Sequence, residues 1–257
     1  MKIIAIVSAK GGVGKTTVSA NLSVALRHFG QNVLSLDLDP QNALRFHLGT
    51  DLQNIHGLSR ASLGRTGWRE ACVQSQSGVY VLPFGLINEN DRQTFERRLD
   101  AEPDWLIRNL NGMGLAENSL VVIDTPPGPS IYMRQVLTAA NYVIVVTLAD
   151  AASYATLPMM EGLIANYCKD RLGFIDHAYI VNQVDRSRQL DKDIVQVTRG
   201  ALGERIIGLI HQDQSVSEAL AFSRSSIDHD PHSQGRKDFL ACAEWLRRRL
   251  AEPDAQR

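Results

Sequence analysis

Short runs of consecutive apolar residues alternate along this chain with longer stretches in which apolar residues recur every three or four positions. Runs of the first kind are typical of parallel strands buried on both faces, and stretches of the second kind indicate amphipathic helices. The pattern therefore predicts an α/β fold, a single doubly wound, mostly parallel sheet flanked by helices. The expected strands cover residues 2–7, 33–38, 79–85, 120–123, 142–147, 178–181 and 205–210.

The helical periodicity predicts a smaller number of longer elements. Between the last strand and the last helix, the polar sequence from His211 to Gly235 predicts a long loop. A length of 257 residues fits one large domain, and we expect it to cover residues 1–250, with a short C-terminal tail over 251–257. The expected helices cover residues 14–29, 68–73, 89–99, 103–110, 153–172 and 234–250.

The most informative motif is S-A-K-G-G-V-G-K-T-T at residues 8–17, between the first strand and the first helix. Glycines in such a loop let backbone N–H groups point inward and surround a phosphate at a helix N-terminus. In a P-loop, a lysine reaches the β- and γ-phosphates and a hydroxyl group binds Mg²⁺. The alternative is a glycine-rich turn that carries two lysines. We predict that ATP binds through Gly11, Gly12, Val13, Gly14, Lys15, Thr16 and Thr17.

Acidic residues follow two of the predicted strands, at the edge where open α/β sheets bind ligands. Asp37 and Asp39 are two residues apart in D-L-D-P-Q-N, which puts both carboxylates on one side of a strand. Asp124 follows four apolar residues, as in a Walker B motif, where a buried strand directs a carboxylate at water on Mg²⁺. Asp37 also fits an ordinary carboxylate at a strand end, and Asn182, after the sixth strand, fits a capping residue in a loop.

Composition narrows the setting of this protein. The net charge is −1, so no global charge attracts the chain to DNA or to anionic lipid. Its three cysteines are far apart and form no C-x-x-C motif, which fits reduced thiols in the cytoplasm better than a disulfide framework or a zinc site. No stretch approaches the ~18 apolar residues of a membrane-spanning helix.

Two details of the P-loop are unusual. Ala9 stands where the general pattern has its first glycine, and a second lysine, Lys10, opens K-G-G-V-G-K-T. This sequence resembles the deviant Walker A ATPases of the SIMIBI class, which include partition ATPases and the division-site ATPase MinD. The resemblance implies that two subunits close over ATP and that Lys10 contacts the partner's nucleotide. The resemblance also implies a role for each residue. Catalysis is assigned to Lys10, Lys15 and Asp39, Mg²⁺ binding to Thr16, Asp37 and Asp124, and contact with the adenine to Asn182.

The middle of the chain resembles a narrower family. G-L-S-R-A-S-L-G-R-T-G-W-R-E-A, over residues 57–71, and the later L-P-F-G turn are similar to the BcsQ (YhjQ) family, MinD-like ATPases encoded with bacterial cellulose synthase. This resemblance implies ATP hydrolysis, a small accessory protein as partner, and contact with the cytoplasmic face of the synthase complex at the inner membrane.

Alternatives stay open at this point. A partition ATPase would bind DNA non-specifically, a scaffold would keep ATP without turnover, and Lys10 together with D-P-Q argues against a small-molecule kinase. MinD relatives end in an amphipathic membrane-targeting helix, whereas the helix expected over 234–250 also fits docking on the sheet, with its arginines in solvent. His211 replaces the proline that partition ATPases usually carry after the last strand, which weakens any adenine contact there.

Overall fold

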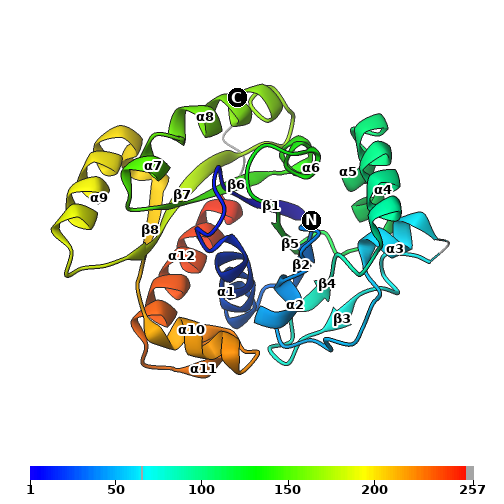
Figure 1. The fold of residues 1–257 in the computed structure, drawn as a ribbon, viewed down its shortest axis with the longest axis horizontal. Helices are drawn as coiled ribbons and strands as arrows, with labels where there is room; N and C mark the ends of the chain where they lie inside the picture. The colour runs from blue at the N-terminus through cyan, green and yellow to red at the C-terminus, as the bar shows by residue number, and fades with distance from the viewer. Residues whose placement is uncertain (65, 253–257) are drawn as a thin grey trace.

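A computed structural model describes residues 1–64 and 66–252 of the chain. Its centre is one eight-stranded sheet in the order β3-β4-β2-β5-β1-β6-β7-β8 (Figure 1). All neighbouring strands are parallel except the edge strand β3, which is antiparallel to β4. The doubly wound, mostly parallel sheet expected from the sequence is therefore confirmed. The strands are β1 (Lys2–Val7), β2 (Val33–Asp37), β3 (Val73–Gln74), β4 (Tyr80–Leu82), β5 (Leu120–Asp124), β6 (Tyr142–Leu148), β7 (Asp176–Val184) and β8 (Ile206–His211).

Helices cover both faces of the sheet because each central strand is apolar on both sides. In β1, Ile3 and Val7 pack with α6 and α8, whereas Ile4 and Ile6 pack with α1 and α12. Besides a 3₁₀ turn at Gly203–Arg205, the helices are α1 (Lys15–His28), α2 (Leu44–His47), α3 (Leu58–Leu63), α4 (Glu89–Ala101), α5 (Trp105–Gly112), α6 (Ile131–Ala139), α7 (Ala151–Tyr154), α8 (Leu157–Tyr167), α9 (Gln189–Leu202), α10 (Gln214–Ala221), α11 (Ser226–His229) and α12 (Gln234–Ala251).

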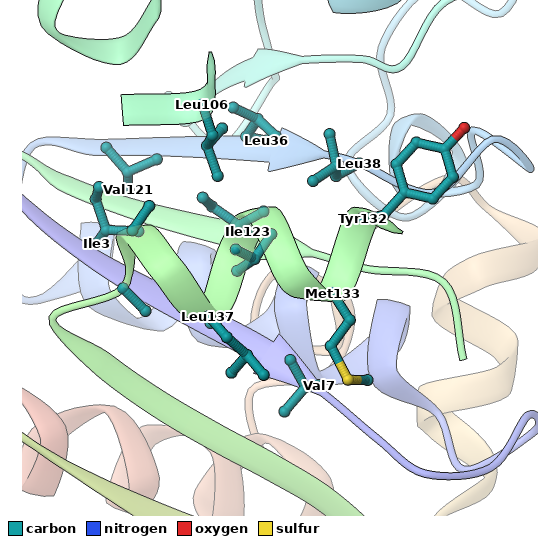
Figure 2. Packing of buried hydrophobic residues seen from close by; sticks show 14 of the residues in the cluster. Ile3, Val7, Leu36, Leu38, Leu106, Val121, Ile123, Tyr132, Met133 and Leu137 are labelled. Atoms are coloured by element: carbon teal, nitrogen blue, oxygen red, sulfur yellow. The ribbon is translucent and has the colours of Figure 1, made fainter. Parts of the chain in front are cut away.

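Helix α6 shows how one face is closed (Figure 2). Its side chains Tyr132, Met133 and Leu137 lie over β1, β2 and β5, and all three are buried. Ser130 caps the helix by accepting a hydrogen bond from the Met133 N–H. Since α6 begins just after the glycine-containing turn that follows β5, this packing ties that turn to the core.

The secondary structure expected from the sequence differs from the structure at several points. Residues 68–71 form turns rather than a helix, because the Trp68 indole packs inward and donates to Ser62 Oγ over 3.0 Å. The helix expected over 153–172 is divided into α7 and α8, and Asp150 caps α7. The expected loop after β8 contains α10 and α11. The helices α2, α3, α6 and α9 and the short strand β3 were not expected.

Helix α12 lies across α1 and β8, as Figure 1 shows. Its apolar residues Phe239, Ala243, Leu246 and Leu250 are all buried in this contact. The face that a membrane-targeting helix would present to lipid is therefore occupied by the core. Among the helices in the described part of the chain, none combines the length and apolar character that crossing a bilayer requires. Of the expected tail, residues 253–257 lie outside the described residues.

Candidate nucleotide site

The P-loop runs from the end of β1 into the first turn of α1. Gly12 and Gly14 have φ values of +75° and +83°, a region that glycine enters without strain. Gly14 is also closely packed, since a Cβ at this position would lie 2.3 Å from Asn182 Nδ2. The loop therefore needs glycine at position 14 for both its backbone angle and its close contact with β7.

Thr16 and Ser19 attach the start of α1 to the end of β5. Thr16 Oγ1 donates to Asp124 Oδ2 over 2.7 Å, and Ser19 Oγ donates to Asp124 Oδ1 over 2.8 Å. The structure thus brings together Thr16 and Asp124, both expected near Mg²⁺. Ser19 was missed by the sequence analysis, although it lies one helical turn after Thr16 and faces the same side.

Asp37 and Asp124 are direct neighbours across β2 and β5. Asp37 is completely buried, and its two oxygens accept hydrogen bonds from the N–H groups of Asp39 and Leu44, each over 3.0 Å. Asp37 therefore also fixes the backbone after β2, a structural role that the sequence left open. Asp39, at the outer end of this turn, accepts a hydrogen bond from the Gln41 N–H over 2.9 Å.

The electrostatics of this cluster favour a cation. Burial raises the pKa of Asp124 to about 6, although Thr16, Ser19 and Lys15 act against it. Burial and the adjacent Asp124 also raise the pKa of Asp37 well above its usual range. Burial lowers the pKa of Lys15, while the charges of Asp124 and Asp39 oppose that shift. Two adjacent buried carboxylates beside a hydroxyl oxygen are hard oxygen donors, and they fit Mg²⁺.

Lys10 lies on the opposite side of the P-loop from this carboxylate cluster. Its Nζ atom is 3.4 Å from Asp150 Oδ1 and 3.3 Å from Ser153 Oγ, at the start of α7. Asp150 also caps α7 by accepting a 2.6 Å hydrogen bond from the Ser153 N–H. Lys10 and Asp150 are 140 residues apart, and no motif in the sequence indicates this contact.

The turn after β5 contacts the P-loop directly. The Gly128 N–H donates to the Ser8 carbonyl over 3.0 Å, with Gly128 at a φ of +73°. Ser8 Oγ in turn donates to the Lys10 carbonyl over 2.7 Å. If either loop moves, it must therefore either break the hydrogen bond between Gly128 and Ser8 or move the other loop with it.

Asn182 lies near the end of β7, and His211 at the end of β8. An adenine contact was expected at Asn182 and not at His211. The Asn182 amide donates a 2.8 Å hydrogen bond to the Val13 carbonyl, so this side chain helps to fix the P-loop backbone. Its contact with adenine stays a prediction. His211 Nδ1 lies 2.8 Å from Asp238 Oδ2, which also accepts from the His211 N–H over 2.9 Å.

Asp124 gives the site a testable pH dependence. With a folded pKa near 6 and an ordinary value of 3.8, its burial makes the apoprotein less stable as pH rises from about 4 to 6. Asp124→Asn should therefore raise the melting temperature of the apoprotein at pH 7.5 by on the order of 5 °C, and less at pH 5. Thermal denaturation at both pH values checks this.

The control for Asp124→Asn is the exposed carboxylate Asp170. Asp170→Asn should leave the melting temperature unchanged at both pH values. With Mg²⁺ and an ATP analogue present the order should reverse, because the wild type gains ligand stabilisation that Asp124→Asn lacks. An Asp124→Asn apoprotein less stable than wild type at pH 7.5 would contradict the assignment.

Comparison with known proteins agrees with this geometry. The family model described as "Cellulose biosynthesis protein BcsQ" matches residues 1–246. BcsQ of Salmonella typhimurium is 27% identical over 95% of this chain and 94% of its own. The chromosome-partitioning ATPase Soj of Thermus thermophilus is 29% identical over 97% and 96%. The structure of MinD from Pyrococcus horikoshii, complexed with Mg-ADP, superposes with a TM-score of 0.79 at 25% identity and 97% coverage of both chains. This chain belongs to the BcsQ family, within the wider group of MinD- and ParA-like ATPases.

Proposed function

We propose that this protein is an ATP-dependent switch that dimerises on ATP, hydrolyses it slowly, and supports assembly, localisation or regulation of the bacterial cellulose synthase complex. The observation that carries the switch is the pair of P-loop lysines. Lys15 is buried under the loop, whereas Lys10 is one-third exposed and held by a long contact to Asp150. A lysine placed in this way is available to a second subunit.

In this mechanism each residue has a role that its environment supports. The N–H groups of the P-loop and Lys15 bind the phosphates, and Lys10 adds positive charge from the partner subunit. Thr16, Asp37 and Asp124 would hold Mg²⁺, which would supply positive charge to the phosphates. Asp39 orients the attacking water. Loss of the γ-phosphate releases the Asp39 and Gly128 turns, and the subunits separate.

The test of the dimer is size exclusion with light scattering, with ADP or with a non-hydrolysable ATP analogue. The wild type should change from a monomer of 28.4 kDa to a dimer only with the analogue, and Lys10→Ala should stay monomeric. Lys237→Ala, on the exposed side of α12, is a matched control that should dimerise normally. A wild type that ignores the analogue, or that is dimeric in every state, would favour a scaffold with structural ATP.

The contact between Lys10 and Asp150 should oppose dimerisation. Asp150→Asn removes the charge but keeps an oxygen that can cap α7, so Lys10 becomes free without loss of the helix. Because exposed ion pairs are weak, the dimer should form at about two- to fivefold lower protein concentration. Sedimentation equilibrium with the ATP analogue measures this. Unchanged or weaker dimerisation would show that Asp150 does not restrain Lys10.

The cellulose role is supported by the family. The names of BcsQ relatives from Salmonella and Escherichia coli state cellulose biosynthesis, with 94% of the Salmonella chain covered. We propose a small accessory protein and the cytoplasmic face of the synthase as partners, which would recruit a cytoplasmic protein to the inner membrane. Deletion of the gene should lower cellulose output, and Lys10→Ala should fail to restore it.

A second candidate function is non-specific DNA binding, favoured by the 29% identity to Soj, which is named a chromosome-partitioning ATPase. Binding of the ATP-analogue dimer to random duplex DNA should then weaken steeply with salt. A net charge of −1 argues against this candidate. The absence of such binding at 50 mM salt would exclude it.

A further inference from the structure

A cavity of about 690 Å³ opens at the edge of the sheet opposite the P-loop. Its floor includes Val33 and Leu34, at the start of β2, and Met113, after α5, and all three are buried. Asp37 lies four residues further along β2, about 13 Å away at the usual rise of a strand. The cavity is therefore separate from the nucleotide site. Its volume and its mostly apolar floor are typical of small-molecule binding sites.

The charged residues of this cavity all have the same sign. Of the described residues that line it, Arg27 and Arg69 are charged, and neither forms an ion pair with any residue that the structure describes. Arg27 belongs to the last turn of α1, and Arg69 to the turn after α3. The cavity thus concentrates two guanidinium groups without a carboxylate, in a protein whose net charge is −1.

Two glycines lie beside these arginines. A Cβ on Gly78 would lie 3.4 Å from Arg27 Nε, and a Cβ on Gly114 would lie 3.8 Å from Arg69 Nη1. These are ordinary contact distances, so a Cβ would fit beside either arginine. Both glycines have positive φ values, +77° and +61°, so another residue would strain the turn.

An aromatic residue also lines the cavity. Tyr80, the first residue of β4, lines the cavity and is 54% exposed. An exposed ring in a cavity that two arginines also line can offer apolar and stacking contact to the body of a ligand, and guanidinium groups bind an anionic group by charge-assisted hydrogen bonds.

We propose that this cavity binds a small organic anion, a carboxylate, sulfonate or phosphate that carries an apolar or aromatic body. Arg27 and Arg69 would bind the anionic group, and Tyr80 and Met113 would contact the body. The inference concerns a second ligand site and does not depend on ATP hydrolysis or on the cellulose role.

The probe is 8-anilinonaphthalene-1-sulfonate, an aromatic sulfonate whose fluorescence rises in apolar sites. It is titrated into the full chain with saturating Mg²⁺ and ATP analogue, so that the P-loop is blocked. We expect saturable binding, weakened at least fivefold by Arg27→Gln and by Arg69→Gln. Arg97→Gln, an exposed arginine of α4 outside the cavity, should bind the dye as the wild type does. Ala116→Trp, at an exposed position that lines the cavity, should block binding.

Competition separates the proposed ligand class from a plain anion site. Decanoate should displace the dye, whereas sulfate at the same concentration should not. Circular dichroism of each variant confirms that it is folded. The proposal is overturned if Arg27→Gln and Arg69→Gln bind the dye as Arg97→Gln does, if the ATP analogue removes all binding, or if sulfate competes as well as decanoate.

Discussion

Asp39→Ala should lower the rate of ATP hydrolysis at least a hundredfold and leave the affinity for an ATP analogue within a few-fold of wild type. Positioning or activation of an attacking nucleophile typically contributes 10²- to 10⁴-fold. Asp39 lies at the outer end of the turn after β2, whereas Thr16 and Asp124 form the inner cluster with their own hydrogen bonds. Removing its carboxylate therefore leaves the phosphate-binding loop intact.

Asp39→Asn is the matched variant, because its amide oxygen can still accept the hydrogen bond from the Gln41 N–H. The two variants together separate loss of charge from loss of the turn. Both should accumulate as ATP-bound dimers, since neither completes the reaction that opens the dimer. Phosphate release and light scattering measure the two properties. Turnover near the wild-type rate, or a failure to dimerise with ATP, would contradict the role of Asp39.

Asp37 provides the contrast to Asp39 on the same turn. Its oxygens accept the Asp39 and Leu44 N–H groups, so Asp37 holds the backbone that carries Asp39. A substitution at Asp37 would change the position of Asp39 as well as the charge near Mg²⁺. Kinetic loss at Asp37 is therefore ambiguous, and Asp39 gives the cleaner test of catalysis.

The sequence predicted the parts of this site that depend on local spacing. A glycine-rich motif that ends in Lys15 and Thr16 directly follows a predicted buried strand, and this order predicts the P-loop. Asp124 directly follows a second run of apolar residues, and this position predicts the Walker B carboxylate. The family resemblance, drawn from residues 57–71 and the L-P-F-G turn, is confirmed by the family match. The contact of Lys10 with Asp150 could not be predicted, because it joins residues brought together only by the order of β1 and β6 in the sheet.

Two errors in the predicted secondary structure have different causes, a polar capping residue and a buried tryptophan. Asp213 precedes α10 and caps it by accepting a hydrogen bond from the Ser215 N–H, whereas the polar character of this segment predicts a loop. Trp68 was assigned to a helix with residues that suit one, yet its indole is buried against Trp105 and its backbone forms a turn. Tertiary packing overrode local preference there, and no single-sequence pattern reveals that.

Trp105→Ala should lower the free energy of unfolding by about 3–5 kcal/mol, the usual range for deleting a large buried aromatic side chain. Trp105 is completely buried, and its ring packs edge-to-face on two other rings. The ring centroids are 5.0 Å apart for Trp105 and Trp68 and 5.2 Å apart for Trp105 and Phe95. For a domain of this size the melting temperature should fall by roughly 10 °C. Chemical denaturation and calorimetry measure both quantities. Trp245→Ala, a half-buried tryptophan of α12, is the control and should cost less.

Trp105→Phe separates the ring from its polar atom. Within the part of the chain that the structure describes, the buried Trp105 Nε1 has no hydrogen-bond partner, so phenylalanine removes an unpaired donor along with some volume. We therefore expect it to cost about 1 kcal/mol or less. The cluster joins Phe84, the phenylalanine of the L-P-F-G turn, to Tyr132 of α6, which follows the Gly128 turn. If Trp105→Ala lowered the free energy of unfolding no more than Trp245→Ala, this aromatic cluster would not be what holds α5 and residues 57–71 against the Gly128 turn. Backbone hydrogen bonds would then have to hold these segments together.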